Sequence, residues 1–293
     1  MSRAVGAVLL GAFLVAALLT PAVYALLASV LDEVPWPFSR VFNRVLFLSL
    51  IAFLFALRRP LDLGRAREAL SAGSRSARLG ALASGAALSL GSAVVALGLA
   101  LAFDDLARSD RAAGELAFKW ARNLPGAVLV SVLEEVFFRL LLFEGLRRRT
   151  PWPVAALLSS AVYSVLHLLS PPRGHEVGRL DVWSGFRYLK ELGEQTLDPA
   201  LLPGLVGLLL VGLALCVSLH RSRSLVRCIG LHAGWFLAAK LAVYATVLPP
   251  DSDSELPVRF LALGLPWTWL TIGFVIAVEW RRSPGSTQTS AAA

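Results

Sequence analysis

Long apolar segments separated by short polar ones make up most of the chain. Eight of these segments are long enough to cross a hydrocarbon core of about 30 Å as helices. They are Ala4–Leu31, Val41–Leu57, Leu79–Phe103, Leu124–Leu146, Trp152–Leu169, Leu201–Leu219, Leu225–Leu248 and Val258–Trp280. This pattern predicts an all-α fold: a polytopic membrane helical bundle with about eight transmembrane helices.

The first apolar segment also begins like a secretory signal peptide. Arg3 precedes it, and Ala22–Ala25 resembles a cleavage site. At about 27 residues, however, the segment is longer than the apolar region of a typical signal peptide. We therefore expect it to be retained as the first span.

No polar segment is long enough to fold separately. We therefore expect residues 1–282 to form one transmembrane domain and the small, polar residues 283–293 to form a disordered tail. The segment Pro171–Pro199 carries aromatic residues among charges and could lie at the membrane interface as an amphipathic piece. The segment Asp62–Arg78 is consistent with a short basic amphipathic helix or with a solvated loop.

Composition and charge support a membrane location. The chain is 56% hydrophobic and only 16% charged, against about 25% charged residues in soluble domains. The net charge is +8, but the arginines lie in short loops between apolar segments, so we expect no nucleic-acid partner. Basic loops stay in the cytoplasm, and here they are every second loop: Arg58–Arg78, Arg147–Arg149, Arg221–Arg227 and Arg281–Arg282. We therefore expect an integral membrane protein, surrounded by the lipid bilayer, with both termini cytoplasmic. The Ala-, Leu- and Arg-rich composition suggests that this membrane is a bacterial inner membrane.

Three charged residues lie inside the fourth apolar segment, where burying a carboxylate costs roughly 2.5–3.5 kcal/mol on insertion scales. Glu135 and Arg139 are four residues apart, so they share a helix face and can pair. Glu134 is rotated by about 100° from Glu135 and remains available. Burial and a neighbouring like charge raise a carboxyl pKa, as a general base near neutral pH requires. The structural alternative to a catalytic role is that these charges form an ion pair that only holds helices together.

Two histidines also lie in apolar segments, His167 in the fifth and His232 in the seventh. Together with the paired glutamates they could activate a water molecule and stabilise an oxyanion. Counting along the predicted spans places Glu134 near mid-membrane, His167 toward the outer end and His232 toward the inner end. A shared site would therefore require shifted or tilted helices.

At these residues the chain resembles the CPBP family, the CAAX proteases and bacteriocin-processing proteins. The family pattern has a Glu-Glu-x-x-x-Arg helix, an aromatic-x-x-x-His helix and a later His-x-x-x-Asn/Asp helix. Glu134 to Arg139 match the first helix, Tyr163 to His167 the second, and His232 the third, while Gly204 to Gly212 resemble a glycine-rich helix that precedes the last one. The matching core covers about residues 124–245. The chain departs from the pattern at Phe236, where the family often has Asn or Asp.

The resemblance implies an intramembrane endopeptidase of the glutamic type. Glu134 would activate the attacking water. Glu135, fixed by Arg139, would orient the site, and His167 and His232 would bind water and stabilise the tetrahedral oxyanion. The chain has no His-Glu-x-x-His motif, so no cofactor is expected. Zinc held by Glu134, His167 and His232 is the alternative.

The expected partner is a polypeptide substrate with a membrane-proximal cleavage site. Bacterial relatives suggest the maturation of exported proteins or the removal of C-terminal sorting signals that anchor them. Two other readings remain open. A non-catalytic membrane scaffold would keep the Glu135–Arg139 pair without needing Glu134, and a proton-coupled transporter would use Glu134 and Glu135 as a relay. We see no internal repeat of the kind transporters tend to show.

Overall fold

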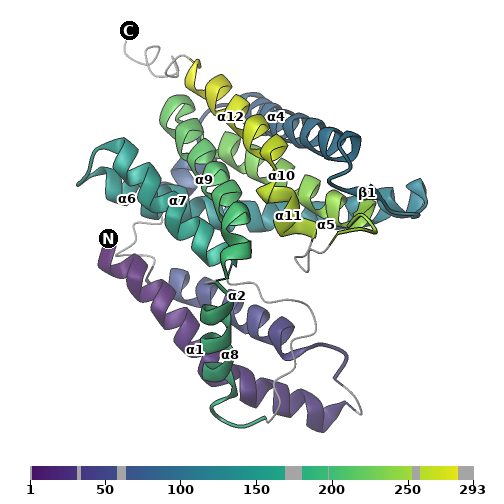
Figure 1. Cartoon of the computed structure of the whole chain (residues 1–293). Coiled ribbons are helices and arrows are strands. Elements are labelled where there is room, and N and C mark those ends of the chain that lie inside the picture. Colours follow the sequence, from purple (N-terminus) through teal and green to yellow (C-terminus); the bar gives the residue numbers. More distant parts are fainter. Residues whose placement is uncertain are drawn as a thin grey trace. The chain divides into compact units, whose positions relative to one another are not determined.

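A computed structural model describes residues 2–31, 34–57, 64–168, 180–196, 198–252 and 258–282 (Figure 1). The expected tail at 283–293 lies outside these residues. The described chain is nearly all helical, as predicted, with one addition. Strands β1 (Ala107–Arg108) and β2 (Thr246–Val247) pair as a short antiparallel ladder.

The chain divides into two compact units, and the prediction of a single domain stays a prediction. Unit 1 is Met1–Gly64 with Val165–Pro199, and unit 2 is Arg65–Ser164 with Ala200–Ala293. Unit 1 contains α1 (Ser2–Val30), α2 (Phe38–Ala56) and α8 (Ser184–Thr196). The other helices are α3 (Gly64–Ser71), α4 (Arg75–Ala102), α5 (Ala113–Glu135), the π-helix η1 (Val136–Phe143), α6 (Glu144–Arg147), α7 (Trp152–Leu168), the 3₁₀-helix η2 (Pro199–Leu201), α9 (Leu202–Ser222), α10 (Leu225–Ala245), α11 (Val258–Gly264) and α12 (Pro266–Trp280).

Five described helices are long and apolar enough to cross a membrane, so the predicted count of eight is not confirmed. These candidate spans are Gly6–Val30, Phe38–Ala56, Arg75–Ala102, Pro199–Ser222 and Leu225–Ala245. The fifth predicted span is a shorter apolar helix, α7. The eighth is divided, because Pro266 begins a new helix and proline cannot continue one without losing a hydrogen bond.

The fourth predicted span differs most from the expectation. Its helix, α5, begins at Ala113, within a segment that we expected to be a loop. Alanine, glutamate, leucine, lysine and arginine favour helix there, and Lys119 Nζ lies 2.6 Å from Glu115 Oε1 one turn away. At its other end, α5 passes directly into the π-helix η1 at Val136.

The amphipathic segment α8 packs within unit 1. Its apolar residues Tyr188 and Leu192 are buried in a cluster with Phe38 and Phe42 of α2. Gly185 allows the close approach to α1, because a Cβ at this position would overlap the backbone of Ala17. The apolar face of this predicted interfacial piece is therefore covered by α1 and α2.

Small residues bring α4 and α10 together in unit 2, where the two helices lie side by side (Figure 1). A Cβ on Gly230 would overlap the carbonyl oxygen of Leu82, and one on Gly234 would overlap the Ser89 hydroxyl. Close approach through small residues is a common way of packing helices in membranes. His232 lies between these two glycines, so the contact fixes the part of α10 that carries it.

A buried ion pair links α10 to α12 in the same unit. Arg227 donates from Nε to Glu279 Oε2 at 3.0 Å and from Nη1 to the Ser84 hydroxyl at 2.7 Å. Glu279 also accepts from Ser218 Oγ at 2.9 Å and from Arg282 Nε at 3.1 Å. We expected Arg227 to be one of the loop arginines that orient the chain, but the structure buries it at 2% exposure.

Candidate functional site

The two adjacent glutamates lie on the last turn of α5, and their surroundings differ. The Glu135 side chain is completely buried, whereas the Glu134 side chain is one quarter (25%) exposed. The 3.6-residue period turns the two side chains in different directions. The helix therefore presents Glu134 toward accessible space and seals Glu135 inside the protein.

Glu135 and Arg139 contact each other, as their spacing predicts. Arg139 Nε lies 3.3 Å from Glu135 Oε2, and both side chains are completely buried. A buried carboxylate needs such a partner, because desolvating an isolated charge costs several kcal/mol. The guanidinium lies 4.9 Å from the centre of the Tyr163 ring, on α7. The charge of Arg139 is thus held between a carboxylate and an aromatic face.

His232 joins the site from α10. Its Nδ1 lies 2.8 Å from Glu135 Oε1, and its Nε2 lies 3.6 Å from Glu134 Oε2. The imidazole therefore lies between the two carboxylates, with one ring nitrogen toward each. The depth mismatch between Glu134 and His232 that we expected is not observed. The boundaries of the fourth predicted span were wrong, and α4–α10 packing fixes His232 beside the glutamates.

The π-helix η1 shapes the site and was not predicted. Such segments are rare and often occur at functional sites. Here η1 begins directly after Glu135 and contains Arg139. Ser159 on α7 donates to the carbonyl oxygen of Phe138 at 3.0 Å, so α7 bonds directly to the backbone of η1. This bond fixes α7 against the helix that carries both glutamates.

His167 lies one residue before the end of α7 and is partly exposed. It belongs to the part of α7 that groups with unit 1, whereas Glu134, Glu135, Arg139 and His232 belong to unit 2. The site described here is built from those four residues. The contribution of His167 stays a prediction.

Ser131 and Tyr163 are further members of the cluster to which sequence analysis gave no role. Ser131 is buried one turn before Glu135, and its hydroxyl has no hydrogen-bond partner among the described residues. The Tyr163 ring packs edge-on to the His232 ring, with centroids 6.0 Å apart. The four-residue spacing of Ser131 and Glu135 places them on one helix face, and it could have predicted that Ser131 belongs to the cluster. The position of Tyr163 within the aromatic-x-x-x-His motif was the signal for the tyrosine.

The donor set favours carboxylate and imidazole chemistry. Among the described residues, no three His, Cys, Asp or Glu side chains are grouped so that they could hold a metal ion. The alternative of zinc held by Glu134, His167 and His232 stays a prediction. Phe236 offers no polar group on the turn after His232. Its ring lies 5.3 Å from Lys240 Nζ.

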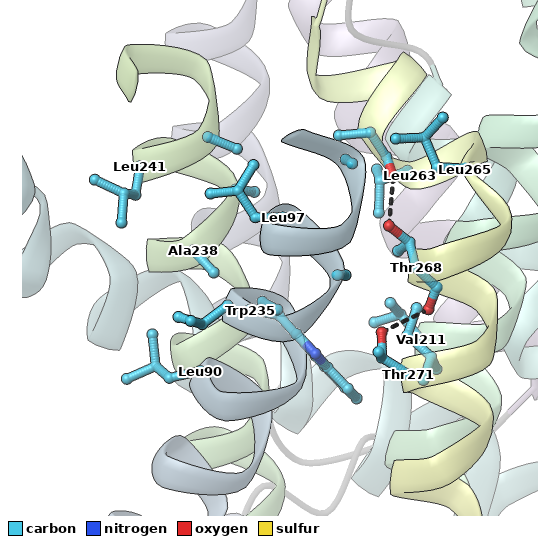
Figure 2. A pocket seen from close by; sticks show the side chains of 18 of the residues that line it. Leu90, Leu97, Val211, Trp235, Ala238, Leu241, Leu263, Leu265, Thr268 and Thr271 are labelled. Atoms are coloured by element: carbon cyan, nitrogen blue, oxygen red, sulfur yellow. Dashed lines mark hydrogen bonds between the residues drawn. The ribbon is translucent and has the colours of Figure 1, made fainter. Parts of the chain in front are cut away.

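A separate cavity of about 110 Å³ lies in unit 2 between α4, α10, α11 and α12. None of Glu134, Glu135, Arg139 and His232 lines it. The hydroxyls of Thr268 and Thr271 are bonded to carbonyl oxygens of Ala262 and Thr268, which leaves a largely apolar wall (Figure 2). This cavity is distinct from the charged cluster.

Comparison with known families identifies the segment that carries the site. Residues 117–238 match the family model described as "Rce1-like: Type II CAAX prenyl endopeptidase Rce1-like". This segment of the chain is similar to the Rce1-like family. The match contains Glu134, Glu135, Arg139 and His232 and confirms the family resemblance inferred from the motifs. No curated protein and no solved structure matches the chain.

The Rce1-like match supports two general statements about the chain. The Rce1-like family is a protease family, so the match supports peptide hydrolysis, with a polypeptide substrate, at the family level. The family and the five long apolar helices together support an integral membrane protein. The match does not assign the substrate, the mechanism, the type of membrane or the orientation of the chain.

Proposed function

We propose that the chain is an intramembrane endopeptidase that hydrolyses a peptide bond with a glutamate-activated water. The observation that carries this proposal is the difference between the two adjacent glutamates. Glu135 is sealed against Arg139 and His232, while Glu134 is accessible and lies on the other side of the same imidazole. An ion-pair staple would need only the sealed residues.

In the proposed reaction, Glu134 takes a proton from water while the water oxygen bonds to the scissile carbonyl carbon. The proton then passes to the leaving nitrogen as the carbon–nitrogen bond breaks. General-base catalysis of this kind contributes typically 10²–10⁴-fold. No metal or covalent intermediate is needed for this proton balance.

His232 is proposed to accept a hydrogen bond from Glu134 once Glu134 has taken the proton from water. The bond an imidazole makes through one nitrogen sets the role of the other. When Nδ1–H donates to Glu135 Oε1, at 2.8 Å, Nε2 faces Glu134. The 3.6 Å separation there is longer than a hydrogen bond and would shorten when substrate closes the site.

Arg139 is proposed to pair with Glu135 so that Glu135 can orient His232. Its Nη1 and Nη2 have no hydrogen-bond partner among the described residues. Ordered water commonly satisfies such buried donors. The proposed role of His167, binding water and stabilising the oxyanion, rests on the family motif alone.

The substrate we propose is an exported protein with a cleavable C-terminal or membrane-proximal segment, processed in a bacterial inner membrane. The test compares the membrane proteome of a deletion strain that carries wild type, Glu134→Ala, Glu134→Gln or Glu144→Gln. Glu144 is the matched control. It follows Glu134 on the same continuous helix but pairs with Arg147 at 2.9 Å.

We expect specific proteins to be shortened with wild type and with Glu144→Gln, and to keep the extra segment with both Glu134 variants at equal expression. The cleavage site then gives the substrate class. Normal processing by both Glu134 variants would contradict the proposal and favour a non-catalytic scaffold.

A further inference from the structure

Arginines gather at one end of unit 2. Three short segments meet there: residues 144–152 after η1, residues 219–227 between α9 and α10, and residues 279–282 at the end of α12. Together they contain eight arginines and two glutamates. We call this region the basic end.

Both glutamates of the basic end are already engaged. Glu279 binds Arg227 and Arg282, and Glu144 binds Arg147. In contrast, the other arginines have no carboxylate partner among the described residues, and these include Arg221, Arg223 and Arg281. Arg223 and Arg281 are exposed, and the buried Arg221 Nε has no hydrogen-bond partner in the described part of the chain. The basic end therefore carries positive charge that the protein itself does not neutralise.

Aromatic rings lie among these charges. The Trp152 and His220 rings stack with centroids 4.5 Å apart and planes 10° apart, and the Trp280 ring lies 5.5 Å from Trp152. The Arg221 guanidinium lies 5.3 Å from the centre of the Trp280 ring, and Arg147 Nη1 lies 3.4 Å from His220 Nδ1. Guanidinium groups and flat apolar rings thus form one continuous surface.

The depth of this surface indicates which anion it would meet. The candidate span Pro199–Ser222 ends within it, and tryptophan is enriched where membranes meet water. Apolar side chains of α7, Leu157 and Leu158, are about half exposed and lie one to two turns beyond Trp152. A ligand here would meet arginine at its phosphate and apolar side chains along its chains.

We propose that the basic end is a binding site for the headgroup of an anionic phospholipid, such as phosphatidylglycerol. Arg221, Arg223 and Arg281 bind the phosphate, and Trp152 and Trp280 pack against the glycerol and the upper acyl chains. Basic surfaces between transmembrane helices bind anionic headgroups in this way. Such a site differs from basic loops that only orient the chain in the membrane, because it binds anionic phospholipid in preference to neutral phospholipid.

The test uses the full-length protein, purified in neutral detergent with equimolar phosphatidylglycerol and phosphatidylcholine, and counts the retained lipids by native mass spectrometry. Wild type should retain mainly phosphatidylglycerol. Removing one charge lowers binding by roughly fivefold, so Arg221→Gln/Arg223→Gln/Arg281→Gln should lose the preference. The control Arg108→Gln/Arg111→Gln/Arg122→Gln removes three exposed charges elsewhere in unit 2 and should keep it.

Thermal unfolding verifies that each variant is folded. If Arg221→Gln prevents folding, the double variant Arg223→Gln/Arg281→Gln replaces two exposed side chains and should still lower the preference about tenfold or more. Equal retention of both lipids by wild type, or equal loss in the control variant, overturns the proposal. Displacement of phosphatidylglycerol by millimolar glycerol phosphate would show a site for a free phosphate and would also overturn it.

Discussion

Helix α10 carries two buried charge clusters five residues apart, and their polar groups are satisfied to different degrees. Arg227 donates to Glu279 of α12 and to Ser84 of α4, while Ser218 of α9 and Arg282 donate to Glu279, so both charges have several partners. Around His232, the Nη1 and Nη2 atoms of Arg139 and the hydroxyl of Ser131 have no hydrogen-bond partner among the described residues. Native proteins leave few buried polar groups unpaired, and those that remain call for an explanation.

The comparison separates a cluster that holds helices together from the one proposed to carry out the chemistry. The Arg227 cluster ties α12 and α4 to α10, and its central ion pair, Arg227–Glu279, is buried. The His232 cluster has one accessible carboxylate and donors left for water. Substitutions test this assignment. Changes in the His232 cluster should lower mainly activity, and changes in the Arg227 cluster should lower mainly stability.

The largest expected effect is on activity, at Glu134. Glu134→Gln keeps the shape of the side chain but removes the base, so kcat/KM should fall by about 10²–10⁴-fold. The side chain is partly exposed and is not a member of the sealed pair, so the melting temperature should change little. Peptidase assays with the processed substrate and thermal unfolding of the same samples check both values. If Glu134→Gln lowers the melting temperature while its folded fraction stays active, the roles assigned to the two clusters are reversed.

The Arg227 cluster should show the opposite behaviour. Glu279→Gln leaves Arg227 buried without its carboxylate, and breaking a buried pair in this way costs about 3–5 kcal/mol. Unfolding in detergent measures the loss. The apolar double variant Arg227→Met/Glu279→Leu should recover much of the stability, because it removes both charges together. If the double variant is no more stable than Glu279→Gln, the cluster does more than pair charges.

A smaller effect is expected where α10 meets α4. Gly230→Ala places a Cβ against the Leu82 carbonyl oxygen, and overpacking of this kind costs about 1–3 kcal/mol. Because His232 follows Gly230 by two residues, activity should fall with stability. The matched control is Gly91→Ala, where a Cβ meets nothing within 4 Å. Equal unfolding temperatures for the two variants would show that α4 and α10 are not in close contact.

The smallest effect concerns pH and lies in unit 1. The hydrogen bond from Arg187 to Asp181, ahead of α8, holds the pKa of Asp181 below its usual range. Because the pKa of Asp181 is lower in the folded state than in the unfolded state, its ionised form stabilises the folded state. This contribution is fully present above the unfolded-state pKa of about 3.9. It is lost as the pH falls through the folded-state pKa. Hydrogen-exchange protection at the start of α8 should therefore decrease below about pH 4. Asp181→Asn should show no such dependence.

Much of this molecule could be predicted from local sequence. Apolar segment length placed most helices, and the four-residue spacing of Glu135 and Arg139 predicted their contact. Two features could not be found in that way. The π-helix after Glu135 has no distinct residue signature, and the partner of Arg227 lies 52 residues away on another helix. An arginine at the end of a span looks the same in sequence whether it orients the chain or is buried.

The Arg227–Glu279 pair also has a consequence for synthesis. Ribosomes add about 5–20 residues per second, so Glu279 follows Arg227 by several seconds. During that interval the nascent bundle contains an arginine whose only acidic partner in the described cluster has not yet been made. Insertion of α12 therefore completes the charge balance of α10 as a late step of assembly. Chains stopped before Glu279 should be cleared by membrane quality control faster than chains stopped after it.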